Sequence, residues 1–528
     1  MQSSQQTAIR FTNHTSAQLF KRLLLMCSLL TIALIEANAQ NSILENRYSF
    51  DTKKVSLYDA LNIVSQKTGY FFIYDSRILE NERRVKLEAR GEKLESIIKG
   101  LLNNPKLDLR VLSKHILIYE KKETTATPKS EQNRHDSTII ISIKGTVYDN
   151  QTRKALQYVS VAIEGTSSGT ITNGEGFFIL KLPQSNEQLN IRISHIGYKP
   201  YTLPVMLVRD QKIDIYLKPD IVSLQEVVIR RVDPTEIITS TIKNLKTNYS
   251  PIPFYLTTFY REGVLKNSTY LSYAEAILKI YKPTINQFLG TEQVKEIKSR
   301  KIINADQTDT LLMKLKGGVS VCLSLDIAKN IPDFLELSEV DKYRYTLSDI
   351  ISYESHNAYA IGFVQKESIE EPLFTGTIYI DTDSLAILGA DFEINPSFIS
   401  KASDYLISQN RRTHIVKPER FAYSLTYRKI GNHYFTNHAK CDIQLKVRKK
   451  GRFFSNNYTA FLEMATCDVD TKNVIKFDKQ ETIRPQVVFL DIPYNYDPDF
   501  WEDFNYIVPE EKINEALKRI NSKIGKVE

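Results

Sequence analysis

A strict alternation of apolar and polar side chains runs through residues 439–448. The apolar series is Ala439, Cys441, Ile443, Leu445 and Val447, and the residues between them are Lys440, Asp442, Gln444, Lys446 and Arg448. Successive side chains of an extended strand point to opposite faces of a sheet, so this period of two predicts a strand with one buried and one solvated face. Cys441 is therefore expected to be a small apolar core residue.

Segments of the same character fill much of residues 233–528. Strands rich in Tyr, Ile and Thr are expected at residues 270–279, 358–365, 375–380, 386–394, 422–430 and 434–447. The last two are expected to form a hairpin around Gly431-Asn432. A helix should begin after Asp233 with Pro234 in its first position, and a second helix should follow Pro509, with Ile513 on its apolar face. We expect residues 233–528 to be one α+β domain dominated by antiparallel sheet, of unknown function.

Residues 138–219 have shorter strands separated by turn residues. The expected strands lie at residues 141–147, 159–164, 169–172, 177–182, 189–195 and 212–217. This spacing is typical of a small β-sandwich. We expect positive φ angles at Gly174 and Gly176, which flank Glu175 in a turn between strands. Residues 220–232 are expected to be a connector.

Residues 45–120 predict a smaller domain with the order β-α-β-β-α-β-β. Ser56 and Asp59 have the form of a capping box, and Gly69 should end the helix that they begin. A second helix carries Leu94, Ile97, Ile98, Leu101 and Leu102 on one face. Taken together, the three domains predict a multidomain, mainly β fold with α+β parts.

The first 39 residues have the order of a secretory signal peptide. Lys21 and Arg22 precede an apolar run over residues 23–35, and Ala37-Asn38-Ala39 forms a small-x-small cleavage site before Gln40. The run is too short for a transmembrane helix, and no later segment is as long and uncharged. Residues 121–137 lack large aliphatic side chains and are expected to be a linker. The protein should therefore be exported.

The charge and the cysteine content argue against a nucleic-acid-binding protein and against a disulfide-rich fold. The net charge is +8, and removal of Arg10, Lys21, Arg22 and Glu36 with the signal peptide leaves +6, with acidic and basic residues interleaved. We therefore expect no nucleic-acid partner. Cys322, Cys441 and Cys467 are too few for a disulfide framework, although a Cys441–Cys467 bridge stays open in an oxidising compartment.

Three parts of the chain resemble known families. The segments Val55 to Leu61 and Thr68 to Tyr74 resemble the short N-terminal (STN) domain of secretins and TonB-dependent receptors. Gly165-Thr166-Ser167-Ser168-Gly169-Thr170, Thr172-Asn173-Gly174-Glu175-Gly176-Phe177 and Ser194-His195-Ile196-Gly197-Tyr198-Lys199 resemble the carboxypeptidase regulatory-like domain of Bacteroidota envelope proteins, which implies a prealbumin-like, seven-stranded sandwich. Leu224-Gln225-Glu226-Val227-Val228-Ile229 resembles the link between this domain and the plug of SusC-like transporters.

No motif predicts catalysis. None of the eight histidines has Asp or Glu three positions later, as a metallocarboxypeptidase zinc site requires, and His433 and His438 are not expected to share a ligand. Gly165-Thr166-Ser167-Ser168-Gly169 matches a nucleophile elbow, but a strand rather than a helix should follow it. Asp381 and Asp383, and likewise Asp468 and Asp470, are expected to cap turns rather than bind calcium. We thus expect no catalytic, cofactor-binding or metal-binding residues, and no cofactor.

These observations predict a non-catalytic binding or assembly protein of a Gram-negative cell envelope. It should reside in the periplasm or at the outer membrane, and its partners should be envelope proteins or glycans. Two alternatives stay open, an accessory or truncated relative of SusC-like transporters and a hydrolase within residues 233–528. The sequence identifies no binding residue.

Overall fold

The computed structural model divides into two compact units, residues 1–134 and 135–528. The residues it describes are 42–74, 79, 83–112, 115–120, 139–209, 211–222, 233–285, 290–303, 318–353, 356–402, 414–486, 501, 503–510 and 513. The expected signal peptide and linker lie outside them, as does the expected C-terminal helix apart from Glu510 and Ile513. In this described part of the chain, no helix is both long and apolar enough to cross a membrane.

The described part of the first unit contains three helices and five strands. Its elements are α2 (Ser42–Glu45), β1 (Arg47–Ser56), α3 (Leu57–Thr68), β2 (Phe71–Tyr74), β3 (Arg84–Lys93), α4 (Leu94–Leu102), β4 (Leu107–Leu112) and β5 (His115–Glu120). β1 pairs with β3, and β5 lies between β2 and β4. The predicted cap is confirmed, because the Ser56 hydroxyl accepts the Asp59 N–H at 3.1 Å and Gly69 ends α3 with φ +74°.

The second unit begins with a sandwich of two small sheets. Its elements are β6 (Ile140–Asp149), β7 (Ser160–Ile163), β8 (Gly169–Ile171), β9 (Phe177–Pro183), β10 (Asn190–Ser194), β11 (Tyr201–Pro204), α5 (Val205–Val208) and β12 (Lys212–Leu217). The strand orders are β11-β10-β7-β8 and β12-β6-β9. Alternate aliphatic residues such as Val161, Leu180 and Ile193 are buried between the sheets. This module, residues 139–219, is called the sandwich below.

One turn of the sandwich differs from expectation. The predicted positive φ is confirmed at Gly176, at +75°, but was wrong for Gly174. The turn needs a left-handed residue only at its end, because the Asn173 side-chain oxygen already accepts the N–H groups of Glu175 and Phe177. Gly174 instead leaves room for Glu510, whose carboxylate accepts the Gly174 N–H at 3.1 Å.

The rest of the second unit is built on one antiparallel sheet of eleven strands. The strands are β13 (Ile221–Val222), β14 (Phe254–Lys266), β15 (Thr269–Lys282), β16 (Gln293–Ile303), β17 (Tyr343–Tyr353), β18 (His356–Gln365), β19 (Phe374–Asp381), β20 (Ile387–Ile394), β21 (His414–Ile430), β22 (His433–Lys449) and β23 (Asn456–Asp470). Their order is β13-β17-β18-β19-β20-β21-β22-β23-β14-β15-β16. The predicted mainly β, multidomain character is confirmed.

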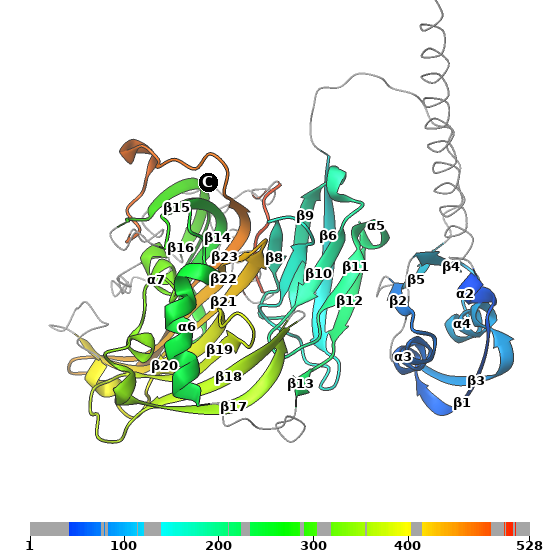
Figure 1. The fold of residues 1–528 in the computed structure, drawn as a ribbon, viewed down its shortest axis with the longest axis horizontal. Coiled ribbons are helices and arrows are strands. Elements are labelled where there is room, and N and C mark those ends of the chain that lie inside the picture. Colours follow the sequence, from blue (N-terminus) through cyan, green and yellow to red (C-terminus); the bar gives the residue numbers. More distant parts are fainter. Residues whose placement is uncertain are drawn as a thin grey trace, which may run out of the picture. The chain divides into compact units, whose positions relative to one another are not determined.

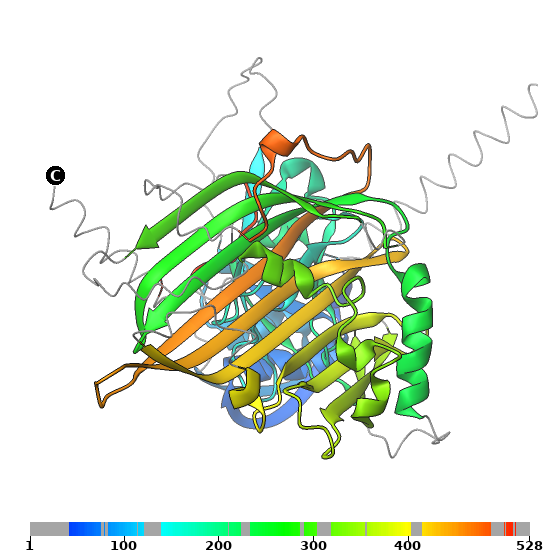
Figure 2. The same ribbon diagram turned by 90° about the vertical axis from the view of Figure 1, so that its left-hand side faces the viewer.

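The two faces of this sheet have different coverings. Helices α6 (Pro234–Asn248) and α7 (Val319–Ser324) lie on one face and close the main apolar core, whereas the sandwich lies against the other face (Figures 1 and 2). Cys441 is in the apolar core on the helix side, as predicted, and Cys467 is in a separate cluster with Phe259 and Trp501. Both thiols are free, so the Cys441–Cys467 bridge is excluded. The strand register places the two side chains on opposite faces of the sheet.

Candidate functional site

The sheet face toward the sandwich carries a continuous row of polar residues. Strand pairing brings one side chain from each of eight neighbouring strands into line, in the order Arg300, Glu275, Arg261, Glu463, Lys440, Ser424, Asp391 and Thr377. The first five alternate in charge. Oppositely charged residues directly across antiparallel strands attract one another, so this polar row stabilises the register.

The middle of the polar row is buried. The Arg261 side chain is 3% exposed and the Glu463 side chain is fully buried, and their Nε and Oε2 atoms lie 2.6 Å apart. The other Glu463 oxygen lies 2.8 Å from His438 Nε2. Burial alone would raise the pKa of Glu463, but Arg261, His438 and Lys440 outweigh it and hold the pKa well below its usual value. Glu463 is therefore a buried carboxylate under the sandwich, and each of its two oxygens has a partner, Arg261 or His438.

The sandwich docks on this centre through an aromatic ring. The Tyr158 ring stacks on His438 with centroids 4.6 Å apart and an interplanar angle of 20°. Its hydroxyl accepts a hydrogen bond from Lys440 Nζ at 2.8 Å. Tyr158 has φ +59°, a conformation that costs a non-glycine residue free energy and persists only where neighbouring contacts hold it. Burial raises the pKa of Tyr158 to about 12, so the hydroxyl stays neutral.

A second set of contacts joins the turn after β7 to β21 and β23. Ser167 donates its hydroxyl to Asp468 Oδ1 at 2.5 Å, and its backbone carbonyl accepts from Arg428 at 2.8 Å. A Cβ at Gly169 would lie 2.2 Å from the Arg428 guanidinium, so the absence of a side chain permits this approach. The local sequence indicates no constraint on Ser167, because both of its partners lie more than 250 residues away in the chain.

Residues 501 and 503–510 lie against both modules. Asn505 bonds the backbone of Lys181 twice, accepting from its N–H at 2.7 Å and donating to its carbonyl at 3.1 Å. Glu510 joins the Gly174 N–H to the Arg261 guanidinium, 3.0 Å away. This segment therefore connects the sandwich to the polar row.

The far end of the sandwich is also joined to the sheet. Gly197 N–H donates to the Ser352 carbonyl at 2.9 Å, and Ser352 N–H donates to the Asp220 carbonyl at 3.0 Å. Two residues of the expected connector, 221–222, form β13 and pair with β17. Because contacts are made at both ends and in the middle, the sandwich and the sheet form one body.

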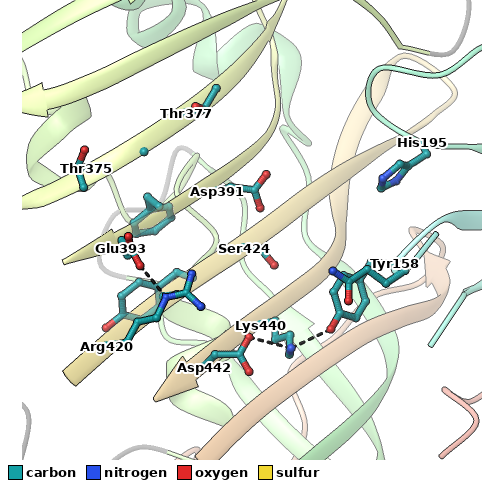
Figure 3. Close-up of a pocket in the computed structure, with 15 residues that line it drawn as sticks. Tyr158, His195, Thr375, Thr377, Asp391, Glu393, Arg420, Ser424, Lys440 and Asp442 are labelled. Carbon is teal, nitrogen blue, oxygen red and sulfur yellow. Dashed lines mark hydrogen bonds and ion pairs between the residues drawn. The ribbon is translucent and has the colours of Figure 1, made fainter. Parts of the chain in front are cut away.

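Between these contacts lies an open cleft of about 740 Å³. The sandwich lines it with Gln157, Tyr158 and His195. The sheet lines it with polar side chains from four adjacent strands, namely Thr375, Thr377, Asp391, Glu393, Arg420, Ser424, Lys440 and Asp442. Figure 3 shows Tyr158 and His195 on the sandwich side and the other labelled residues on the strands of the sheet.

Four of the five charged side chains that line the cleft form two ion pairs. Lys440 Nζ lies 2.8 Å from Asp442 Oδ2, and Arg420 Nε lies 2.7 Å from Glu393 Oε2 (Figure 3). Burial alone would lower the pKa of Lys440, but the charge of Glu463, together with Tyr158 and Asp442, raises it. Lys440 therefore remains a cation that donates hydrogen bonds and is not available as a base.

Two other cleft residues have perturbed pKa values. Burial lowers the pKa of His195 to about 4, so the imidazole is neutral near pH 7 and can both donate and accept hydrogen bonds. The surrounding protein raises the pKa of Asp391, and a hydrogen bond from Tyr379 opposes this effect. The cleft thus presents hydroxyl, amide, imidazole and carboxylate groups close together.

The motifs considered in the sequence analysis occupy turns and strands in the structure. The segment Gly165 to Gly169 leads into strand β8, not a helix, as expected. Asp381 accepts the N–H groups of Asp383 and Ser384, so its predicted turn cap is confirmed. Asp470 caps in the same way through the Lys472 N–H, but Asp468 binds Ser167 instead. No group of three or more His, Cys, Asp or Glu residues suited to a metal ion occurs among the described residues.

The cleft could not be located from the sequence. Lys440 and Asp442 were expected on a polar strand face, and His195 stood within a family motif, but Tyr158, Asp391 and Ser424 carried no local signal. Strand pairing joins Asp391 to Ser424 and Ser424 to Lys440, across loops that separate them in the chain. A local pattern cannot report such proximity.

Comparison with known proteins identifies the sandwich. Residues 143–229 match the model of the CarboxypepD_reg-like domain. A curated relative, the TonB-dependent receptor SusC of Bacteroides thetaiotaomicron, is 37% identical over 89 residues, which are 17% of this chain and 8% of the receptor. The chain thus matches only a small part of that receptor's length.

Two solved structures match this chain with lower sequence identity and with low TM-scores. A DUF1329 family protein from Desulfovibrio piger has 12% identity and a TM-score of 0.21, over 46% of this chain and 96% of the other. A domain described as an outer membrane lipoprotein-sorting protein, from Vibrio parahaemolyticus, has 7% identity and a TM-score of 0.20, over 46% and 93%. These values carry no argument about function. The chain contains a carboxypeptidase regulatory-like domain at residues 143–229, and this domain and the similarity to SusC fit a role in the cell envelope.

Proposed function

We propose that this protein is an exported, non-catalytic binding protein of a Gram-negative envelope, and that its ligand binds in the cleft between the sandwich and the sheet. The observation that carries the proposal is the shared lining of the cleft, to which both modules contribute polar side chains. Ligand sites are commonly concave and lie where domains meet.

Pairing of the cleft charges favours binding over catalysis. A general base or nucleophile needs a proton acceptor poised near the reacting atom. Here Lys440 is bonded to Asp442 and Tyr158, and Arg420 is paired with Glu393. These contacts hold the side chains in place as donors and acceptors, which suits recognition.

The lining favours a hydroxyl-rich ligand, and we propose a glycan. The aliphatic hydroxyls of Thr375, Thr377 and Ser424 are interspersed with paired charges, and the lining also includes the neutral imidazole of His195. A strongly anionic ligand would meet the carboxylates of Asp391, Glu393 and Asp442. A polyhydroxylated chain can donate to the carboxylates and accept from Lys440 and Arg420.

A glycan array followed by calorimetry tests this function. We expect the full chain to bind one class of glycan, and Asp391→Ala combined with Ser424→Ala to weaken binding at least tenfold. Gln444→Ala is a matched control, because Gln444 is an exposed polar residue of β22 that does not line the cleft. Equal loss in the control, or binding of peptides but of no glycan, would contradict the proposal.

A role beside a TonB-dependent transporter is a second candidate. The similarity to SusC, a TonB-dependent receptor, extends over 89 residues, and the chain also contains the regulatory-like domain at residues 143–229. Affinity purification from envelope extracts should recover a transporter if this candidate holds. Recovery of soluble partners alone would count against it.

A further inference from the structure

The turn between β22 and β23 exposes two adjacent aromatic rings. Phe453 is 93% exposed and Phe454 is 89% exposed, more than any other large hydrophobic residue that the structure describes. Exposure of two neighbouring phenylalanine rings to water is unfavourable in free energy, so such a pair marks an interaction surface. This surface has no residue in common with the cleft lining, although β22 leads from the cleft residues Lys440 and Asp442 to the tip.

The hairpin that carries these rings is firmly held at its base. The last paired residues are Val447 and Asn456, and the chain turns between them with Gly451 at φ +80°. Asn267, in the turn between β14 and β15, bonds both Asn456 and Asn457 at 2.9–3.0 Å. Figure 2 shows the tip projecting beyond the neighbouring strands, at the lower left. The rings are thus presented at the end of a supported hairpin.

The tip is also strongly basic. Residues 443–462 contain Lys446, Arg448, Lys449, Lys450 and Arg452 and no acidic residue. All five basic side chains are exposed. Only Lys446 has an acidic partner on the adjacent strand, Glu419, among the ion pairs given for the described residues. The paired strand adds Lys417 and the exposed Ile415 on the same edge.

We propose that this hairpin tip, residues 449–454, attaches the protein to an anionic phospholipid bilayer. Aromatic side chains can enter the boundary between headgroups and acyl chains while lysine and arginine remain among the phosphates. Each basic residue near an anionic surface strengthens binding about fivefold. A second copy of the chain fits less well, because a symmetric contact would bring two clusters of like charge together.

Vesicle co-sedimentation of the full chain tests the attachment. We expect binding to vesicles of phosphatidylethanolamine and phosphatidylglycerol, weaker binding to phosphatidylcholine, and loss of affinity as salt rises. Phe453→Ser with Phe454→Ser should weaken binding at least tenfold. Lys449→Gln with Lys450→Gln should weaken it about twenty-fivefold at low salt.

Matched controls separate the tip from general surface effects. Ile475→Ser removes another large exposed hydrophobic group, 74% exposed, and Lys243→Gln with Lys246→Gln removes two exposed charges from α6. Both controls should bind within twofold of the parent. Phe453→Trp should keep binding and show a blue-shifted fluorescence change on vesicle addition, against the constant signal of buried Trp501.

Three outcomes would overturn the inference. These are equal binding to anionic and neutral vesicles, tip variants that bind like the controls, and a dimer in sedimentation equilibrium that the Phe variants abolish. Glycan binding by the cleft should be unchanged in the tip variants, so failure here is distinct from failure of the cleft proposal.

Discussion

The ring of Tyr158 lies on the imidazole of His438, with centroids 4.6 Å apart, and so joins the sandwich to the sheet through two residues that are 280 positions apart in the chain. His438 in turn lies 2.8 Å from Glu463, and Tyr158 accepts from Lys440. A single stack therefore links the wall of the cleft to the buried charges of the polar row.

Tyr158→Phe should keep the stack and remove the hydrogen bond from Lys440. We expect a loss of about 1–2 kcal/mol in the free energy of unfolding of the second unit, because a bond to a charged donor is lost. Tyr158→Ala should cost more, since the stacked ring is lost as well. Urea denaturation of the two variants measures both effects, and equal stability of Tyr158→Ala and the parent would contradict this role.

Glu463→Gln should make stability depend less on pH. At pH 7 we expect a loss of roughly 3 kcal/mol, because the buried Arg261 loses its charged partner on β23. The folded-state pKa of Glu463 is lowered, so its stabilising effect is complete above the ordinary value of 4.5 and declines as pH falls below it. The difference between parent and variant should shrink from pH 5 to pH 3. A difference that stays constant over this range would show that Glu463 is not held as a carboxylate.

Gly389→Ala should loosen the sandwich from the sheet. A Cβ at this position would lie 2.7 Å from the Leu425 carbonyl oxygen and 3.0 Å from Ile196 Cδ1 of the sandwich. We expect a loss of about 1–3 kcal/mol. Gly362→Ala is the control, since its nearest neighbour is the Ser348 hydroxyl at 3.3 Å, and it should be close to neutral. Similar melting temperatures for the two variants would contradict the close packing.

Ser167→Ala should lower stability slightly and abolish no reaction. Its hydroxyl bonds Asp468 in the folded protein, so we expect a loss of about 1 kcal/mol. A double-mutant cycle with Asp468→Ala should give a coupling energy of similar size. Loss of a measurable hydrolysis with an unchanged fold would instead support the nucleophile that the local motif suggests.

Caps, turns and the alternating strand around Cys441 could be predicted from neighbouring residues. The contacts between distant strands could not. Ser56, Gly69 and Asp381 act through neighbours within four residues, so their roles could be read directly. The alternation around Cys441 correctly placed it in a core. By contrast, Arg261 and Glu463 are 202 residues apart, and neither β14 nor β23 was among the strands expected from the sequence.

The site shows the same limit. Its walls come from Tyr158 and from strands beyond residue 374, so no window of sequence contains both. The local motifs indicated only a separate sandwich module. Its docking on the sheet involves contacts of Ser167 with Arg428 and Asp468, which are remote in the chain. Phe453 and Phe454 did carry a readable signal, because they are adjacent aromatics in a basic stretch that interrupts an alternating pattern.

Photocross-linking with a diazirine derivative of the bound glycan tests the central claim most directly. If the ligand lies between the sandwich and the sheet, mass spectrometry should find adducts on peptides from both walls, around Tyr158 and around Ser424 or Lys440. The Asp391→Ala, Ser424→Ala variant should lose both. Adducts confined to one module, or to residues 42–120, would contradict a cleft that the two modules form together.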